Sequence, residues 1–394
     1  MIDLERVRAD TPGVEHVTHF NNAGSSLPPR QVVDAVVEHL HREAEIGGYE
    51  AAAERNDRLE HTYDALAELI GARRDEIAVI ENATRAWDMA FYAFSFEPGD
   101  RILTGHAEYA SNWIALCQVA AKTGAVIEVV PDDEHGQIDV AALERLIDDR
   151  VKLVSLVHVP MTTGLVNPAS EVGRVTRAAG VPLLLDATQS IGQLPVDVNE
   201  IGCDILATTG RKFLRGPRGT GFLYVRRDLI RQLEPPFLDL HAADWLPDGS
   251  YRIRPDARRF ENWETYCAGK IGLGVAADYA LELGLESIWA RLQELASRLR
   301  ESLGELPGVT IRDVGLTRAA IVTFTVDGVA ATDVMAALAS ERINVNTQPK
   351  NHSWLDLGTR GLDAVVRSSL HYYNSDEEID RLVDAVRRAG RAAF

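Results

Sequence analysis

Short apolar runs rich in Val, Ile and Leu recur between residues 77 and 225, and segments with helical spacing separate them. Apolar strands that alternate with helices in this way are typical of a mostly parallel sheet covered on both faces. The pattern therefore predicts an α/β fold in which ligands bind at the carboxyl ends of the strands. The expected strands are residues 77–80, 101–103, 126–130, 153–159, 181–186, 204–208 and 221–225.

The character of the sequence changes after Pro255. A long helical region from about Gly269 to Leu303 is followed by short strands and helices, which indicates a smaller α+β domain. We predict an N-terminal arm at residues 1–20 that packs with the small domain. A large domain at 21–260 and a small domain at 261–394, which begins with a long linking helix, complete the chain.

Composition and charge exclude several classes of protein. The net charge is −18 and no basic stripe with interleaved aromatic residues is visible, so we expect no nucleic-acid partner. No apolar run reaches the roughly 18–20 residues that cross a bilayer. Residues 1–8 lack the basic-then-apolar order of a signal peptide, so we expect a cytoplasmic protein without a membrane partner. Cys117, Cys203 and Cys267 are odd in number and widely spaced, which argues against a disulfide framework or a metal cluster.

The stretch from residue 204 to residue 225 places a single lysine, Lys212, between two apolar runs. A lysine in such a place is most often a solvated strand end. Hydroxyl side chains and a glycine precede it, however, and the other lysines of the chain all have ordinary explanations. Those are Lys122 at a helix end, Lys152 at a strand start, Lys270 within a predicted helix and Lys350 in a polar loop. Lys212 is therefore the candidate for a chemical role.

Asp186 ends the apolar run that precedes the one leading to Lys212. The two side chains could form a structural ion pair, or they could hold the two ends of a pyridine aldehyde. Pyridoxal 5'-phosphate needs a lysine for its Schiff base and an acid that keeps its ring nitrogen protonated. Its phosphate needs hydroxyl and backbone N–H groups at a helix start, which Ala83 and Thr84 supply at a strand-to-helix junction.

The order of these and further motifs resembles the class V aminotransferase family of fold-type-I pyridoxal 5'-phosphate enzymes. That family includes cysteine desulfurases, isopenicillin N epimerase, kynureninase and C–S lyases of the ergothioneine pathway. The resemblance implies a large domain with a mostly parallel seven-stranded sheet, a smaller C-terminal α+β domain and bound pyridoxal 5'-phosphate. It rests on residues 22–24, 83–84, 107–112, 186–190, 209–212, 216–221 and 366–374.

The resemblance also implies roles for residues around the cofactor. Lys212 would form the Schiff base and later move the α-proton of the substrate. Asp186 would pair with the pyridinium nitrogen, and Gln189 would bond the phenolic oxygen. Tyr109 replaces a histidine that usually stacks on the ring, and Arg211 replaces a histidine before the lysine, where a guanidinium suits phosphate.

The phosphate site and the substrate site follow from the same resemblance. The Ala83 N–H group, Thr84 and Thr209 would hold the phosphate. The family usually forms a homodimer, in which Arg218 or Thr220 would reach the phosphate of the partner. Arg367, which could otherwise be solvated or ion-paired, would bind the substrate α-carboxylate, so we expect an α-amino acid substrate. Asn22 and Gly24 would add contacts near that carboxylate.

The sequence leaves the reaction open. A desulfurase that relays a persulfide needs a cysteine on the loop before Arg367, and residues 346–354 contain none. Residues 43–49 resemble a segment of the ergothioneine-pathway C–S lyases, or form a helix-end turn at Gly47-Gly48. Residues 258–264 could recognise a second anionic group or brace the interdomain seam. We favour a C–S lyase that eliminates a thiol or sulfenate from a cysteine S-conjugate, ahead of aminotransfer, epimerisation and a non-catalytic cofactor-binding protein.

Overall fold

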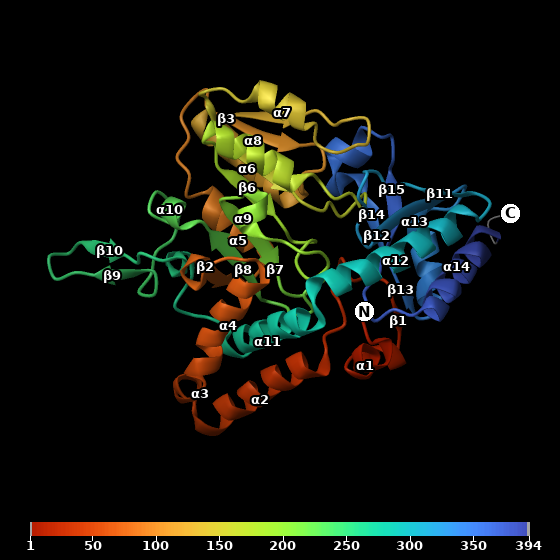
Figure 1. Cartoon of the computed structure of the whole chain (residues 1–394), viewed down its shortest axis with the longest axis horizontal. Coiled ribbons are helices and arrows are strands. Elements are labelled where there is room, and N and C mark those ends of the chain that lie inside the picture. Colours follow the sequence, from red (N-terminus) through yellow and green to blue (C-terminus); the bar gives the residue numbers. More distant parts are fainter. Residues whose placement is uncertain (1, 392–394) are drawn as a thin grey trace.

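The large domain is built around a seven-stranded sheet in the order β2-β8-β7-β6-β5-β3-β4 (Figure 1). The structure, a computed structural model, describes residues 2–391. Strand β8 runs antiparallel to both of its neighbours, and the other adjacent pairs are parallel. The predicted α/β fold with a mostly parallel sheet is therefore confirmed. The strands are β2 (Ile77–Ile80), β3 (Arg101–Gly105), β4 (Val126–Val130), β5 (Val151–Val157), β6 (Leu183–Asp186), β7 (Ile205–Thr209) and β8 (Gly221–Val225).

The sheet is buried on both faces, which explains its nearly continuous apolar strands. Along β6, Leu183 and Leu185 belong to one hydrophobic cluster and Leu184 belongs to another. Successive side chains of a strand point to opposite faces, so both faces require apolar residues. The helices between the strands are α5 (Ala83–Phe91), α6 (Ala110–Thr123), α7 (Val140–Leu146), α8 (Ala169–Ala179), α9 (Val198–Ile201) and α10 (Arg227–Ile230).

A second group of helices lies along the lower side of the large domain (Figure 1). Helix α11 (Cys267–Leu283) packs against α2 (Arg30–Ile46) and α4 (Asn56–Leu69), and α3 (Gly48–Glu54) joins these last two. The expected long linking helix is in fact two helices, because Gly284 adopts a φ of +81° between α11 and α12 (Leu285–Gly304). A non-glycine residue would be strained there.

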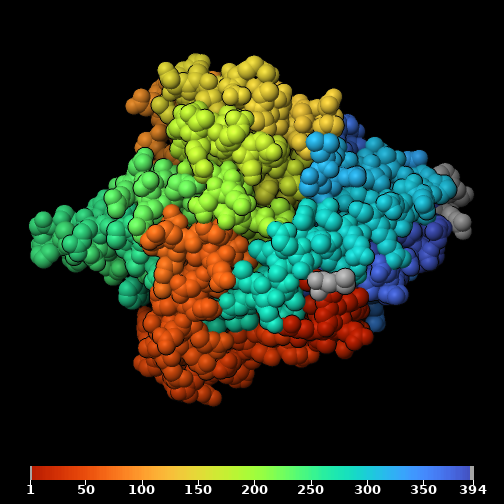
Figure 2. Space-filling view, viewed as in Figure 1, coloured from red at the N-terminus to blue at the C-terminus, as the bar shows by residue number. Residues whose placement is uncertain are grey.

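The small domain carries a four-stranded antiparallel sheet in the order β11-β12-β15-β14. It packs against one side of the large domain, and a hairpin of β9 (Ala243–Trp245) and β10 (Tyr251–Ile253) projects from the other side (Figure 2). Its remaining elements are β11 (Val309–Ile311), β12 (Ile321–Val326), α13 (Ala331–Ser340), β13 (Ile343–Asn344), β14 (Asn346–Pro349), β15 (Ala364–Ser369) and α14 (Asp376–Arg391).

The N-terminal arm lies against the small domain. After α1 (Leu4–Ala9), strand β1 (Thr18–His19) pairs in parallel with β13. The backbone of Asn21 then bridges to Ser369 at the end of β15. Within residues 2–391, no helix is both long enough and apolar enough to span a membrane.

Arg215 connects the arm, the large domain and the small domain. Its buried guanidinium donates to the Leu27 carbonyl oxygen at 2.8 Å, the Tyr372 hydroxyl at 2.8 Å and Thr11 Oγ1 at 2.6 Å. It also lies 4.8 Å from the centre of the Tyr373 ring, within cation–π range. Because Arg215 follows Lys212 by three residues, these contacts fix the turn that carries the lysine.

Replacement of Arg215 by lysine tests this connection. A lysine ammonium cannot reproduce the planar fork, so buried acceptors lose their donors. We expect Arg215→Lys to lower the free energy of unfolding by about 2–4 kcal/mol, measured by urea denaturation. Arg174→Lys, at an exposed position on α8, is the matched control and should change it by less than about 0.5 kcal/mol. Equal stability of the two variants would contradict the role of Arg215.

Candidate active site

A cavity of about 210 Å³ opens at the carboxyl ends of the parallel strands, as expected for this class of sheet. The turns after β6 and β7, the first residues of α5 and α6, and the loop after β14 meet around it. Eight of the predicted cofactor-binding residues line it together. They are Ala83, Thr84, Tyr109, Asp186, Gln189, Thr209, Arg211 and Lys212.

Lys212 stands in a positively charged environment at this cavity. The surrounding protein lowers its pKa to about 7, first by burial and then through the positive charges of Arg211 and Arg367, and Asp186 opposes the shift only partly. Half of the amine is therefore neutral near pH 7, whereas an ordinary lysine is almost fully protonated. A neutral amine is the form that can attack an aldehyde or accept a proton.

Asp186 lies at the end of β6, in the strand next to the one that leads to Lys212. Its Oδ1 accepts from the Thr188 backbone N–H at 3.0 Å, and its Oδ2 accepts from Asn112 Nδ2 at 3.0 Å. The carboxylate is therefore held by neutral donors rather than by the lysine, and the simple ion-pair explanation for Asp186 and Lys212 does not apply.

The residues of this cavity fit pyridoxal 5'-phosphate. Gln189 Oε1 and Thr188 Oγ1 are buried without a hydrogen-bond partner, although both residues line the cavity. Buried polar atoms normally have partners, so these two atoms indicate a polar ligand. Helix α5 begins at Ala83 and directs its first N–H groups towards the cavity, which suits a phosphate.

Two of the expected phosphate ligands also make bonds within the protein. Thr209 Oγ1 donates to the Thr220 carbonyl oxygen at 3.2 Å. Arg211 donates to the Gly24 carbonyl oxygen and so connects the cavity to the N-terminal arm. Burial and the charge of Arg218 lower the pKa of Arg211. An anion beside Arg211 would relieve this repulsion.

Arg367 is a buried guanidinium without a carboxylate partner among the described residues. It is 2% exposed, its Nη2 donates to Asn21 Oδ1 at 3.2 Å, and its Nε has no partner. Burial, with a further contribution from Arg211, lowers its pKa to about 10. A buried cation with one neutral contact is costly unless an anion joins it. The solvated and ion-paired alternatives for Arg367 therefore do not apply in this part of the chain.

The structure gives different contacts to Asn22 and Gly24, the two residues predicted near the substrate carboxylate. The Asn22 amide donates to the Ser369 carbonyl oxygen at 2.8 Å and accepts from the Tyr373 hydroxyl, so its polar atoms hold the arm in place. Asn21 is instead the asparagine that contacts Arg367. A Cβ atom at Gly24 would lie 2.6 Å from Asn21 Oδ1, which explains the glycine.

Several residues at the cavity had no role in the sequence prediction. Glu108 and Asn112 lie within a predicted motif, but only the folded chain shows that Asn112 contacts both Glu108 and Asp186. His352 and Ser353 reach the cavity from the loop after β14, and Met161 from the loop after β5. A polar loop before Arg367 is the only signal in the sequence that points to His352 and Ser353.

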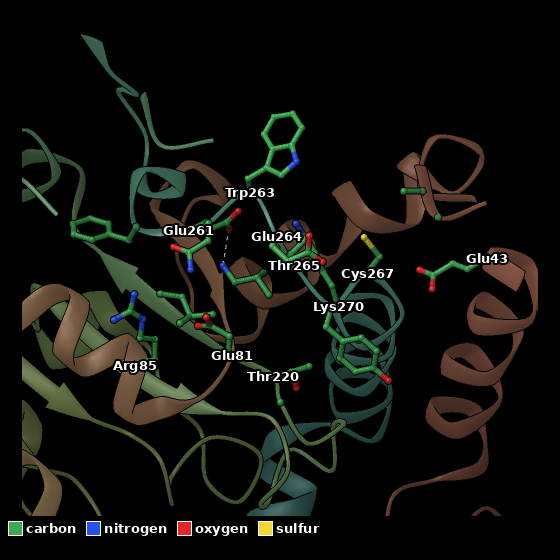
Figure 3. Close-up of a pocket in the computed structure, with 18 of the residues that line it drawn as sticks. Glu43, Glu81, Arg85, Thr220, Glu261, Trp263, Glu264, Thr265, Cys267 and Lys270 are labelled. Atoms are coloured by element: carbon green, nitrogen blue, oxygen red, sulfur yellow. Dashed lines mark hydrogen bonds between the residues drawn. The ribbon is translucent and has the colours of Figure 1, made fainter. Parts of the chain in front are cut away.

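A second, larger pocket of about 690 Å³ lies beside α11 (Figure 3). Thr220, Glu261, Cys267 and Lys270 line it, together with Gly48 of the glycine turn. Within the protomer the Gly47-Gly48 turn therefore lies at this pocket and not at the Lys212 cavity.

Two arginines of η3 (Ala257–Phe260) connect it to other elements of the large domain. Arg258 donates to both carboxylate oxygens of Glu60, at 3.0 and 2.6 Å, and stacks over the Tyr63 ring at 3.8 Å. Arg259 donates to backbone carbonyl oxygens, including that of Ile230 at 2.7 Å. These contacts indicate a structural role for Arg258 and Arg259, but they lie within the large domain and not at a seam between the two domains.

Comparisons with known proteins agree with this geometry. A family model described as Aminotransferase class-V matches residues 18–382. The chain is 31% identical to the cysteine desulfurase of Haloferax volcanii, over 98% of this chain and 96% of that protein. The apo structure of a cysteine desulfurase from Thermococcus onnurineus NA1 has a TM-score of 0.92 and 29% identity, and the match covers 100% of this chain and 99% of that one.

A further structure, of the cystine C–S lyase C-DES with its product cysteine persulfide, shares the fold. Its TM-score is 0.87 at 24% identity, over 96% of this chain and 99% of that one. The chain belongs to the class V aminotransferase family. It is a pyridoxal 5'-phosphate-dependent enzyme, and the predicted cofactor is confirmed.

The lowered pKa of Lys212 gives a test of the site. Apoprotein mixed with pyridoxal 5'-phosphate and trapped with borohydride should carry the label on Lys212, identified by peptide mass spectrometry. Because only the neutral amine reacts, the labelling rate should rise through pH 7 and level off, rather than rise towards about 10 as for an ordinary lysine. Arg367→Gln removes one lowering charge and should move the midpoint upward. A midpoint near 10 in the unmodified protein, or labelling of Lys212→Ala, would contradict the assignment.

Proposed function

We propose that the chain is a C–S lyase that acts on a cysteine-derived α-amino acid and releases its sulfur substituent into solution. This proposal rests on the residues that the loop preceding Arg367 in the sequence contributes to the wall of the cavity. The loop there presents His352 and Ser353 to the cavity and no thiol. Relatives named cysteine desulfurases support sulfur chemistry, and the absence of a thiol at this wall favours release of the sulfur over its capture by the chain.

The free thiols of the chain lie elsewhere. Cys117 is exposed on α6, Cys203 is buried before β7, and Cys267 lines the second pocket. None of the three belongs to the wall of the Lys212 cavity. A sulfur atom that leaves the substrate therefore meets a histidine, a serine or water.

The roles of the chain's own residues follow from the site. The cofactor supplies an electron sink for the substrate α-carbon when it is bound. In our proposal Asp186 faces the ring nitrogen, Gln189 faces the phenolic oxygen, and the first N–H groups of α5 hold the phosphate. Arg367 forks onto the substrate carboxylate, for which its unpaired Nε is free.

Lys212 carries the proton transfer in this proposal. Burial is the largest cause that lowers the pKa of Lys212, and it favours the neutral amine that takes the proton from the substrate α-carbon. The electron pair of the broken Cα–H bond forms a Cα=Cβ double bond as the Cβ–S bond breaks, and the Cβ–S electron pair leaves with the sulfur atom. Water converts the remaining aminoacrylate to pyruvate and ammonia, so the elimination consumes no amino-group acceptor.

The loop after β14 is held against the large domain, where it limits access to the cavity. Asp356 accepts from Thr162 Oγ1 at 2.7 Å and from Arg360 Nη1 at 3.1 Å. Thr162 belongs to the cavity wall, so this bond ties the loop to the edge of the site. Exclusion of water at this edge strengthens the electrostatic contacts inside the cavity.

We further propose that the enzyme is a homodimer with shared active sites. Arg218 and Gly219 are exposed next to Thr220, and Thr220 stands between the two pockets, since its carbonyl oxygen bonds Thr209 while the residue itself lines the second pocket. Tyr49 and Trp263, which line that pocket, are 77% and 57% exposed. Large exposed aromatic side chains at a pocket are typical of an interaction surface.

Product analysis tests the lyase proposal. With S-substituted cysteines and no 2-oxo acid, the holoenzyme should form pyruvate and ammonia in equal amounts, and Lys212→Ala should form neither. A variant with Cys117, Cys203 and Cys267 all replaced by serine should keep the rate within about twofold, because no thiol takes part in the proposed elimination. Product formation that depends strictly on a 2-oxo acid would instead identify an aminotransferase. Loss of activity in the cysteine-free variant, with its stability unchanged, would indicate a persulfide relay.

Complementation tests the shared site. Lys212→Ala and Arg218→Ala should each be inactive alone if Arg218 acts on the partner's cofactor. Mixed dimers then contain one intact site, so re-equilibrated equal mixtures should recover about a quarter of the original activity. Light scattering after size-exclusion chromatography checks that dimers are present. A mixture that stays inactive although mixed dimers form would place Arg218 outside the partner's site.

A further inference from the structure

Two carboxylates lie buried on the closed side of the Lys212 cavity, and one amide joins them. Asn112 Nδ2 donates to Asp186 Oδ2 at 3.0 Å and to Glu108 Oε1 at 2.9 Å. Glu108, Asn112 and Asp186 are 4%, 2% and 6% exposed. Burial of two acids around one amide is costly because each ion loses its hydration, so hydrogen bonds have to offset that cost.

The hydrogen bonds of Glu108 indicate which form of the carboxyl group the fold accommodates. Oε1 accepts from the Tyr109 backbone N–H at 2.8 Å as well as from Asn112. Oε2 accepts from Thr104 Oγ1 at 2.6 Å and from Ser155 Oγ at 2.9 Å. Four donors from four separate groups complete the acceptor positions of an ionised carboxylate. Burial and the nearby Asp186 raise the pKa of Glu108, and these donors oppose that shift.

Glu108 and Asp186 bring two carboxyl groups to the same part of the cavity wall. Glu108 is contacted from β3, α6 and β5, and the charged group facing it is Asp186 on β6. The positive groups Lys212, Arg211 and Arg367 act on one another across the site. Glu108 and Asp186 thus lie together at the wall of the cavity, and Asn112 lies between them.

We propose that Glu108 is a positioning residue which, through Asn112, orients Asp186 and keeps the cofactor ring nitrogen protonated. The inference rests on the proposed contact between Asp186 and that nitrogen. A negative charge behind Asp186 increases the proton affinity of the whole acid–nitrogen pair. A protonated ring nitrogen is what makes the ring an effective electron sink. The same contacts fix the start of α6, so the amide of Asn112 has one orientation.

The test uses holoenzyme reconstituted with 15N-labelled pyridoxal 5'-phosphate and followed by NMR without substrate. In the unmodified enzyme the nitrogen signal should stay at the protonated position. Glu108→Gln keeps the shape and removes the charge, so the nitrogen should lose its proton at a pH lower by about one to two units, the effect of one charge several ångströms away at an effective dielectric constant near 20. Glu108→Asp keeps the charge and should retain the protonated signal.

The remaining outcomes separate charge from packing. An equal shift in Glu108→Gln and Glu108→Asp, or no shift in either, would overturn the proposal. An unprotonated signal in the unmodified holoenzyme would instead overturn the contact between Asp186 and the nitrogen, and it would leave the lyase assay unaffected. If Glu108→Gln does not fold, Thr104→Val combined with Ser155→Ala removes both donors from Oε2. That variant favours the neutral acid and should give the same shift, and an unchanged signal in it would also overturn the proposal.

Discussion

The active site depends on how the chain holds the turn after β7, and Arg215 is the residue that holds it. One buried guanidinium bonds Thr11 and Leu27 of the N-terminal segment and Tyr372 of the small domain. Without an acid beside it, the charge is satisfied by a carbonyl, two hydroxyls and aromatic faces. The N-terminal segment and both domains therefore meet three residues from Lys212.

Charge is separated across this cavity. Arg211 and Arg367 lower the pKa of Lys212, and Arg211 also lowers that of Arg367, while Asp186 and Glu108 share another part of the wall through Asn112. A ligand with an anionic phosphate, an aldehyde and a basic ring nitrogen matches each part of this arrangement. The repulsion among the cations is stored in the protein alone, and it is relieved when anionic groups bind.

The family and the reaction are determined by different parts of the molecule. The sheet, the turn after β7 and the start of α5 define a pyridoxal 5'-phosphate enzyme of the class V aminotransferase family. In the proposed reaction the sulfur atom of the substrate leaves beside the loop after β14, which presents His352 and Ser353 to the cavity. Asp356 ties that loop to Thr162 of the large domain, so the small domain contributes part of the cavity wall.

The sequence by itself was enough to predict the α/β sheet and to select Lys212 and Asp186 as candidate site residues, because apolar periodicity and the ends of strands are local properties. Eight predicted cofactor residues meet at one cavity because strands of a parallel sheet end at the same edge. The break between α11 and α12 can be recognised only from the backbone φ angle of Gly284. The different contacts of Asn21 and Asn22 can be recognised only when their partners on β15 and in the small domain are in place. Only the tertiary structure decided that Arg367 has no carboxylate partner among the described residues and that Asn112 joins Glu108 to Asp186. The contacts of Arg367 with Asn21 and of Asn112 with Asp186 join residues 346 and 74 positions apart, which no local pattern records.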